Sequence, residues 1–205
     1  MLKNFRLAAF LCGFLLWLQP ILSHADTPVL SVAEGPVLSS ADGFGVRVKN
    51  AEIMLQDDSY VLSADIDYRL SMRAKDALEN GVPLYWDIHI KTLQHRDYFW
   101  DQTLVNTSIR YRIQYHALLN MYRVRKESSG EVDNFSTLSA ALDAMSAIHN
   151  FRVMNKASYV SGKRYAVGIK VTLDRDALPL PLRPVAYTNP QWYLSSDWTL
   201  WPLTK

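Results

Sequence analysis

A two-residue alternation of apolar and polar side chains recurs along this chain and constrains its fold more than any other feature. The longest run covers residues 60–70, where Asp65 and Asp67 are among the polar positions. Its apolar positions are Tyr60, Leu62, Ala64, Ile66, Tyr68 and Leu70. Successive side chains of a β-strand point to opposite faces of the sheet, so this run predicts a strand with one buried face.

Several other segments alternate in the same way. Residues 46–55 alternate with a change of phase at Lys49–Asn50, which predicts a β-bulge. Turn-forming residues follow at 56–59, so this strand and the next are predicted to form a hairpin. Further strands are predicted at residues 84–91, 109–117 and 165–173, and a strand, a turn and a short return strand are predicted over residues 120–135.

Two segments have helical features instead. Residues 71–81 start with a capping residue, Ser71, and end at Gly81, which predicts a short helix. Residues 136–150 predict a longer amphipathic helix that Ser136 caps and Asn150 ends. Its apolar stripe consists of Leu138, Ala141, Leu142, Met145 and Ile148.

At least six alternating strands, joined mostly by short turns, require an antiparallel arrangement. We therefore predict a mainly β fold: an antiparallel β-sandwich with one or two short added helices, for which the immunoglobulin-like sandwich is one candidate. The folded part is predicted to be a single β-rich domain over residues 44–205. Residues 26–43 are rich in Ser, Pro, Ala and Gly, and we predict a partly ordered lead-in segment there.

The first 25 residues have the pattern of a secretory signal peptide. Lys3 and Arg6 precede an uncharged apolar run, and the small residues Ser23 and Ala25 suit cleavage after Ala25. An uncleaved inner-membrane anchor is the alternative, although the run is short for a bilayer span, which takes about 20 residues. No later segment is long and apolar enough to span. Cys12, the only cysteine, lies inside the apolar run, so we expect no disulfide in the mature chain.

Charge and motif content argue against several function classes. The chain has 22 basic and 20 acidic residues, and removal of Lys3 and Arg6 with the signal leaves 20 of each sign. Such a chain lacks the basic excess that nucleic-acid binding needs. The sequence after the signal has no cysteine nucleophile, no Gly-x-Ser-x-Gly motif and no phosphate-binding glycine loop. We predict no cofactor and no nucleic-acid partner.

One predicted strand face carries candidate metal ligands. Asp87, His89 and His95 share this face if the strand continues to residue 96, and His116 lies on the next strand. A zinc site needs three or four ligands that converge. A solvated face of mixed charge explains the same pattern, and we favour it, so no metal site is assigned.

Asp65 and Asp67 form a second candidate site. Two positions apart on one strand face, they lie about 6.5 Å from each other, within the roughly 5–9.5 Å that separates the carboxylates of glycosidases. Nothing in the sequence raises the pKa of either one. We favour an ion ladder with Arg110 and Arg112 of another strand.

The C-terminal segment is rich in proline and tryptophan. Residues 178–184 contain Pro179, Pro181 and Pro184, a spacing that favours an extended polyproline connection. Residues 192–201 predict a terminal hairpin that turns at residues 195–197.

Two interpretations of this segment compete. In the first, a partner protein recognises residues 181–184 as a PxxP-like motif and binds exposed side chains around it. The partner-binding residues of this interpretation are Arg183, Tyr187, Trp192, Trp198 and Trp201. In the second, which we favour, the tryptophans close the end of a sandwich core, because large aromatic side chains are mostly buried. Neither interpretation assigns a catalytic residue.

Four segments carry a family resemblance: residues 64–90, 111–124, 135–145 and 176–203. The run Leu-Pro-Leu-Pro-Leu-Arg-Pro and the ending Ser-Ser-Asp-Trp are their most specific parts. Together they resemble DUF4390, a proteobacterial family of exported proteins of unknown function, over roughly residues 45–203. The resemblance implies a periplasmic or envelope location in a Gram-negative bacterium and no particular activity. It also implies the periplasmic region of a membrane sensor kinase as a candidate partner.

Two function hypotheses follow. The leading one is a non-enzymatic periplasmic interaction module, accessory to an envelope sensor kinase, which requires an exposed apolar or aromatic patch. The alternative is an envelope enzyme or small-ligand-binding protein, with Asp65, Asp67 or the His89 face in a concave pocket.

Overall fold

The computed structural model describes residues 43–96 and 100–203. The predicted signal peptide, residues 1–25, and all but the last residue of the predicted lead-in, residues 26–43, lie outside them. By its contacts the chain divides into two units, residues 1–38 and 39–205, and every element described below belongs to the second.

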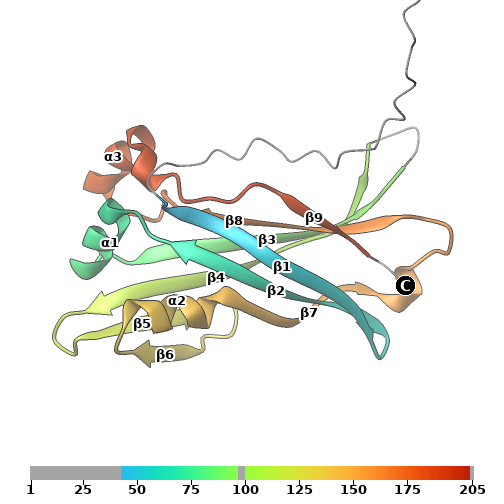
Figure 1. Ribbon diagram of the computed structural model, residues 1–205, viewed down its shortest axis with the longest axis horizontal. Coiled ribbons are helices and arrows are strands. Elements are labelled where there is room, and N and C mark those ends of the chain that lie inside the picture. Colours follow the sequence, from blue (N-terminus) through green and yellow to red (C-terminus); the bar gives the residue numbers. More distant parts are fainter. Residues whose placement is uncertain (1–42, 97–99, 204–205) are drawn as a thin grey trace, which may run out of the picture. The chain divides into compact units, whose positions relative to one another are not determined.

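The strands of the described residues form two antiparallel sheets (Figure 1). The smaller sheet has the order β1-β2-β7, with β1 (Gly45–Gln56), β2 (Ser59–Arg69) and β7 (Ala147–Asn155). The larger sheet has the order β6-β5-β4-β3-β8-β9. Its strands are β3 (Leu84–Gln94), β4 (Gln102–His116), β5 (Met121–Lys126), β6 (Val132–Phe135), β8 (Tyr165–Leu173) and β9 (Thr199–Pro202). Their apolar faces share one core, so the predicted mainly β, antiparallel sandwich is confirmed.

The core follows the two-residue alternation. Leu84, Trp86, Ile88 and Ile90 of β3 are fully buried, as predicted. Between the sheets, the ring of Tyr68 on β2 meets that of Trp86 edge to face, with centroids 5.1 Å apart. Full burial of such a side chain contributes about 1.5–3 kcal/mol, so alternating strands on both sheets supply a core that needs no disulfide.

The first hairpin forms as predicted. The register of β1 and β2 shifts between Val48 and Asn50, at the predicted bulge. Asp57 has a φ of 53° in the turn between the strands, a conformation that Asp adopts more readily than most residues. Ala117 was predicted to be the last inward-facing residue of β4. It instead lies in the exposed turn that follows this strand.

The strand order corresponds to that of an immunoglobulin variable-type sandwich, in which strands A, B and E pair in one sheet and strands C″, C′, C, F and G in the other. Here β1, β2 and β7 correspond to strands A, B and E. The other sheet corresponds to C″, C′, C, F and G through β5, β4, β3, β8 and β9, in that order. The described residues add β6 and contain no strand D in the smaller sheet.

Two side chains reinforce this correspondence. Trp86 occupies the strand C place, where immunoglobulin domains bury a tryptophan. At the start of β8, the hydroxyl of Tyr165 accepts a 3.0 Å hydrogen bond from the backbone N–H of Val160, five residues upstream. This resembles the tyrosine corner at the start of strand F. The strand order and both contacts support the immunoglobulin-like candidate.

Helix α1 (Met72–Glu79) also forms as predicted. The Ser71 hydroxyl accepts a 3.2 Å hydrogen bond from the Ala74 N–H, and Gly81, with a φ of 81°, follows the helix end. The same hydroxyl donates a 2.6 Å hydrogen bond to the carbonyl of Gln191. The cap of α1 therefore also holds the C-terminal segment.

The second helix is shorter than predicted. Helix α2 spans Leu138–Ser146, and Thr137 caps it instead of Ser136. The helix does not reach Asn150, because the residues after it form β7. Ile148 is consequently a buried strand residue that pairs with β2. This long-range pairing outweighs the local helical pattern.

The predictions of a polyproline connection and a C-terminal hairpin are wrong. Leu180–Leu182 form a 3-10 turn, η2, and Arg183–Thr188 form helix α3. Pro181 and Pro184 are the second residues of these two elements, within the first turn, where a helix needs no N–H donor. The residues of the PxxP-like motif are therefore helical and do not have a polyproline conformation.

The end of the chain joins the larger sheet. Pro190–Trp192 form a 3-10 turn, η3, Ser195 bridges to Thr172, and β9 pairs with β8. A short isolated hairpin is only marginally stable, whereas a strand added to an existing sheet edge gains backbone hydrogen bonds and a packed face.

Candidate functional site

The candidate metal ligands of the sequence do not converge. Asp87 and His89 are on the outer face of β3, but His95 follows the last residue of that strand. The pairing of β3 with β4 places His116 at the opposite end of the sheet from His95. Within residues 43–96 and 100–203, no three His, Cys, Asp or Glu side chains lie close enough together to hold a metal ion.

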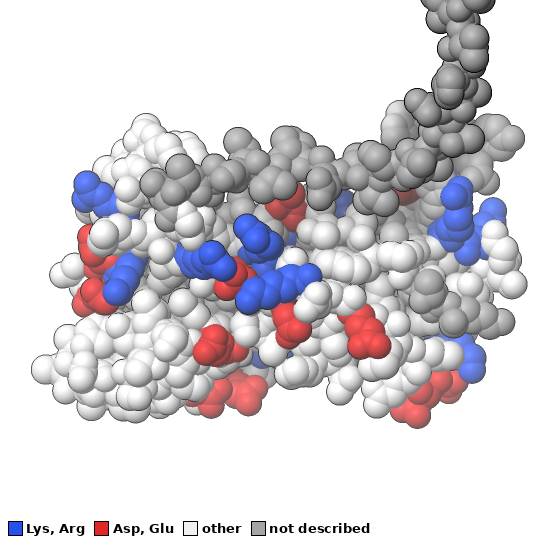
Figure 2. Space-filling model, in the orientation of Figure 1, with Lys and Arg blue, Asp and Glu red and all other residues white. Residues whose placement is uncertain are grey.

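Asp65 and Asp67 are on the outer face of the smaller sheet, and Asp67 pairs locally. Its carboxylate oxygens lie 3.7 Å from Lys49 Nζ and 3.0 Å from Arg69 Nε. Figure 2 shows basic and acidic side chains interspersed over this face. The His89 face belongs to the other sheet, so Asp65 and Asp67 do not combine with it in one site.

The arginines expected to pair with these carboxylates have other partners. Arg110 contacts the carboxylates of Asp87 and Asp174, and Arg112 lies 3.6 Å from that of Glu127. The predicted ladder is therefore wrong in its partners, because Arg110 and Arg112 belong to the larger sheet.

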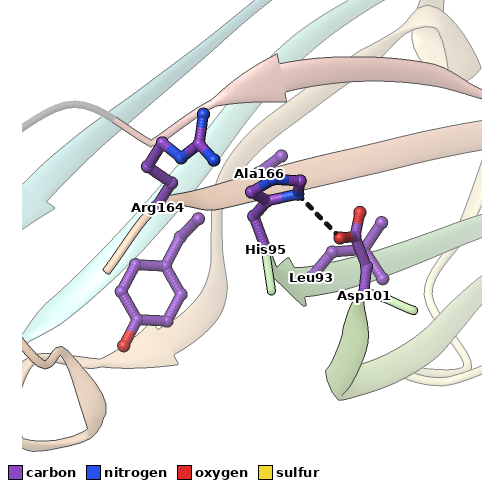
Figure 3. A pocket seen from close by; sticks show the side chains of 6 residues that line it. Leu93, His95, Asp101, Arg164 and Ala166 are labelled. Carbon is purple, nitrogen blue, oxygen red and sulfur yellow. Dashed lines mark hydrogen bonds and ion pairs between the residues drawn. The ribbon is translucent and has the colours of Figure 1, made fainter. Parts of the chain in front are cut away.

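A small pocket lies where β3 ends and β8 begins (Figure 3). Its volume is about 220 Å³, below the roughly 300–1,000 Å³ of typical ligand pockets. Its described lining consists of Leu93, His95, Asp101, Arg164, Tyr165 and Ala166. His95 Nδ1 is 2.9 Å from Asp101 Oδ1, a contact that can orient an imidazole as a general base. Because this lining includes no serine, threonine or cysteine to activate, the pocket supports no assignment as a nucleophilic active site.

Three of the five predicted partner-binding residues are buried or half-buried. Trp192 is only 3% exposed and belongs to the core, so it is not part of an exposed platform. Arg183 Nε donates a 2.8 Å hydrogen bond to the carbonyl of Leu178 and holds the turn before α3. Trp201 is half-buried against the core, opposite Val167 of β8.

Trp198, the fourth, is exposed on the outer face of the larger sheet. Lys91 Nζ lies 3.9 Å from the centre of its ring, a cation–π contact that fixes the ring's position. Leu200 lies beside it on β9. A Cβ atom at Gly168 of β8 would come within 2.8 Å of Leu200 Cδ2, so this glycine lets β9 side chains lie close to the sheet.

Tyr187, the fifth, belongs to a group that we call the tyrosine stack: Arg175, Tyr187 and Tyr193. The guanidinium carbon of Arg175 lies 4.6 Å from the ring centre of each tyrosine. The Tyr193 hydroxyl donates to the Tyr187 carbonyl, and the Tyr187 hydroxyl donates to Asp176. This last hydrogen bond raises the pKa of Tyr187. Both rings are exposed yet held in place.

Three connections gather at one end of the sandwich (Figure 1). They are the β2–β3 connection with α1, the β4–β5 turn, and the β8–β9 connection with α3; we call this the loop end. The Gln114 side chain donates a 3.2 Å hydrogen bond to the Gly81 carbonyl and so ties β4 to the segment after α1. The exposed large apolar side chains of the loop end are Met72, Leu118, Leu119, Leu180, Val185, Tyr187 and Tyr193. In immunoglobulin variable domains, the same three connections form the antigen-binding loops.

Sequence reasoning missed Arg175, Tyr193 and the leucines of the β4–β5 turn. Leu118 and Leu119 were detectable, because two adjacent apolar residues stand in a turn between two alternating runs. The tyrosine stack was not detectable, because only the fold of the irregular β8–β9 connection brings its members together.

Comparison with known proteins gives one match. The model of a domain of unknown function, DUF4390, matches residues 44–202. No curated protein and no solved structure matches the chain significantly. The helices of the described residues are all too short or too polar to cross a membrane.

Proposed function

Because the chain belongs to the DUF4390 family, whose function is unknown, we propose a function from its surface: a non-enzymatic interaction module of the bacterial cell envelope that binds a protein partner at the loop end. The observation that carries this proposal is the gathering of exposed apolar and aromatic side chains from three connections at that end. Exposed apolar side chains gathered in one region of the surface are typical of interaction sites.

The tyrosine stack is the proposed centre of the binding surface. Tyrosine and arginine are enriched among the residues that contribute most to protein–protein binding. Arg175 and the hydroxyl hydrogen bonds already hold Tyr187 and Tyr193, so their binding costs less side-chain entropy than that of free rings. Val185 and Leu180 extend the surface along the same connection.

The cellular part of the proposal rests on the sequence. The signal-like pattern of residues 1–25 and the family resemblance favour export to the periplasm. The periplasmic region of a sensor kinase is then a candidate partner. Trp198 is exposed on the adjoining outer face of the larger sheet, and we propose it as a second contact for the same partner.

Affinity capture from envelope extract tests the proposal. The double variant Leu180→Ser/Val185→Ser removes exposed side chains at the loop end and is expected to fold normally while losing a specific partner. Met54→Ser/Val160→Ser, which removes two comparably exposed side chains elsewhere, is the matched control and should retain it. Equal retention by both variants, with unchanged thermal unfolding, would exclude the loop end as the binding surface.

A further inference from the structure

The β4–β5 turn projects two leucines into solvent. Leu118 is fully exposed and Leu119 largely so. The turn that carries them is ordered: the Leu119 N–H donates to the His116 carbonyl at 3.1 Å, and the Asn120 N–H donates to the Ala117 carbonyl at 3.2 Å. The leucines are therefore presented by a hydrogen-bonded turn.

A side-chain contact also holds the turn. Asn120 has a φ of 50°, in the left-handed region that Asn tolerates better than most residues. Its Oδ1 accepts a 2.7 Å hydrogen bond from the hydroxyl of Tyr115. Tyr115 in turn packs on Tyr122 of the paired strand, with ring centres 4.9 Å apart. This half-buried aromatic pair, which also packs against the core, thus stands directly behind the apolar tip.

Cationic side chains follow behind the aromatic pair. The pair of residues next to the turn is His116 and Met121. Tyr115 and Tyr122 lie one residue further from the turn than this pair, and Arg123 lies two residues further. Arg112 and Arg125, which are opposite each other, lie four residues further. With a rise of about 3.4 Å per residue, these layers lie roughly 3, 7 and 14 Å from the base of the turn.

This cationic group has few carboxylate partners. Arg112 and Arg125 are directly opposite each other and share Glu127, at 3.6 and 3.9 Å. Arg123 Nε donates to the amide oxygen of Asn134 at 3.1 Å. Like charges directly opposite on neighbouring strands are unfavourable, and an anionic ligand would offset that repulsion.

We propose that the β4–β5 hairpin docks tip-first into the interface of an anionic lipid bilayer. Leu118 and Leu119 enter the acyl region, the tyrosine pair lies at the depth of the headgroups, and Arg123 contacts lipid phosphates. Arg112 and Arg125 lie just outside the headgroups, where the negative surface potential attracts them. The headgroup region of one leaflet is about 5–7 Å thick, which matches the distance from the turn to the tyrosines and Arg123. Aromatic side chains concentrate at this depth, and basic side chains bind anionic surfaces.

The order of these layers along the hairpin favours lipid over protein as the binding partner of the tip. A stable protein interface buries about 800 Å² on each partner, and two leucines on a narrow hairpin offer much less. The sequence apolar, aromatic, cationic along a single axis follows the depth profile of a bilayer interface. The inference assigns the tip of the β4–β5 turn to lipid and leaves the tyrosine stack, Leu180 and Val185 as the protein-binding part of the loop end, so it does not depend on the proposed function.

An environment-sensitive fluorophore on the full-length chain tests the proposal. Cys12→Ser removes the only cysteine, and Ala117→Cys then places a nitrobenzoxadiazole label beside both leucines. Asp58→Cys in the β1–β2 turn is the matched control. Any membrane attachment by residues 1–25 affects both labelled proteins equally, so a difference between the two labels reports the turns themselves.

With vesicles of equal parts phosphatidylglycerol and phosphatidylcholine, the label at position 117 should shift to shorter wavelength and brighten, and the label at position 58 should not. Leu118→Ser/Leu119→Ser should weaken this response about tenfold to a hundredfold. Arg123→Gln/Arg125→Gln should weaken it about fivefold per arginine, and Lys156→Gln/Lys163→Gln should leave it unchanged.

Two results would overturn the proposal. One is a label at position 117 whose emission does not change when the folded protein is mixed with anionic vesicles. The other is a response that persists undiminished in the leucine variant. Either result would overturn the lipid contact and leave the proposed protein-binding function untouched.

Discussion

The hydroxyl of Thr92 on β3 donates a 2.9 Å hydrogen bond to the backbone carbonyl of Val153 on β7, and this contact joins the two sheets inside the core. Thr92 is fully buried. Val153 has no partner on β2, because the register of β2 and β7 shifts at this residue. Its carbonyl therefore gains from the opposite sheet a donor that the neighbouring strand does not supply.

Thr92→Val should therefore destabilise the domain although it keeps the shape of the side chain. The change leaves a buried carbonyl without its donor, which costs about 1–3 kcal/mol. Urea unfolding measures the loss. Thr107→Val, at a half-buried position of β4, is the control and should change the free energy of unfolding by less than about 0.5 kcal/mol. Equal effects of the two variants would show that the contact between the sheets contributes nothing.

Ser71→Ala should cost more than an ordinary helix cap. The variant loses the cap of α1, worth about 1 kcal/mol, and also deprives the Gln191 carbonyl of its donor. We expect a total loss of about 2 kcal/mol. Thr137→Ala removes the exposed cap of α2 and should cost about 1 kcal/mol. Similar losses in the two variants would mean that the Ser71–Gln191 bond does not hold the loop end together.

Tyr68→Phe should be neutral or slightly stabilising near pH 8. The Tyr68 hydroxyl is buried and has no hydrogen-bond partner among the described residues, so its removal relieves a desolvated polar group. A loss above about 1 kcal/mol in chemical denaturation would show that the hydroxyl is hydrogen-bonded after all.

The same residue predicts a dependence on alkaline pH. Burial, and secondarily Tyr111, raise the pKa of Tyr68 above its ordinary value of 10.0. The unfolded tyrosine then loses its proton before the folded one, so the contribution to stability is present below about pH 10 and is lost as the pH rises further. The free energy of unfolding should fall less steeply above pH 10 in Tyr68→Phe than in the parent protein. Parallel pH profiles would contradict this.

Much of the sheet structure was predictable, because burial of one face imposes period two on the sequence. The bulge at Lys49–Asn50 was visible as a change of phase. β7 was missed because Ile148 fits both the helical stripe before it and the strand that contains it. Only pairing with β2 decides between them, and that partner is about 85 residues away in the chain.

The C-terminal segment was harder, because proline restricts the backbone without choosing one structure. The same φ that suits polyproline suits the first turn of a helix, and burial of Leu178 and Ala186 selects the helical form here. The candidate surface was predicted only through Tyr187. Its other members come from three separate connections that meet when the sandwich forms.

Site-specific photo-crosslinking at the loop end tests the central claim most directly. A photoreactive amino acid replaces Val185, which is 48% exposed in α3, or Val160, which is 55% exposed in the β7–β8 connection and serves as the matched control. After irradiation of cells that export the protein, position 185 should yield a discrete protein adduct that Leu180→Ser weakens, and position 160 should not yield it. A folded protein that gives no adduct from position 185, or the same adduct from both positions, would contradict a binding surface at the loop end.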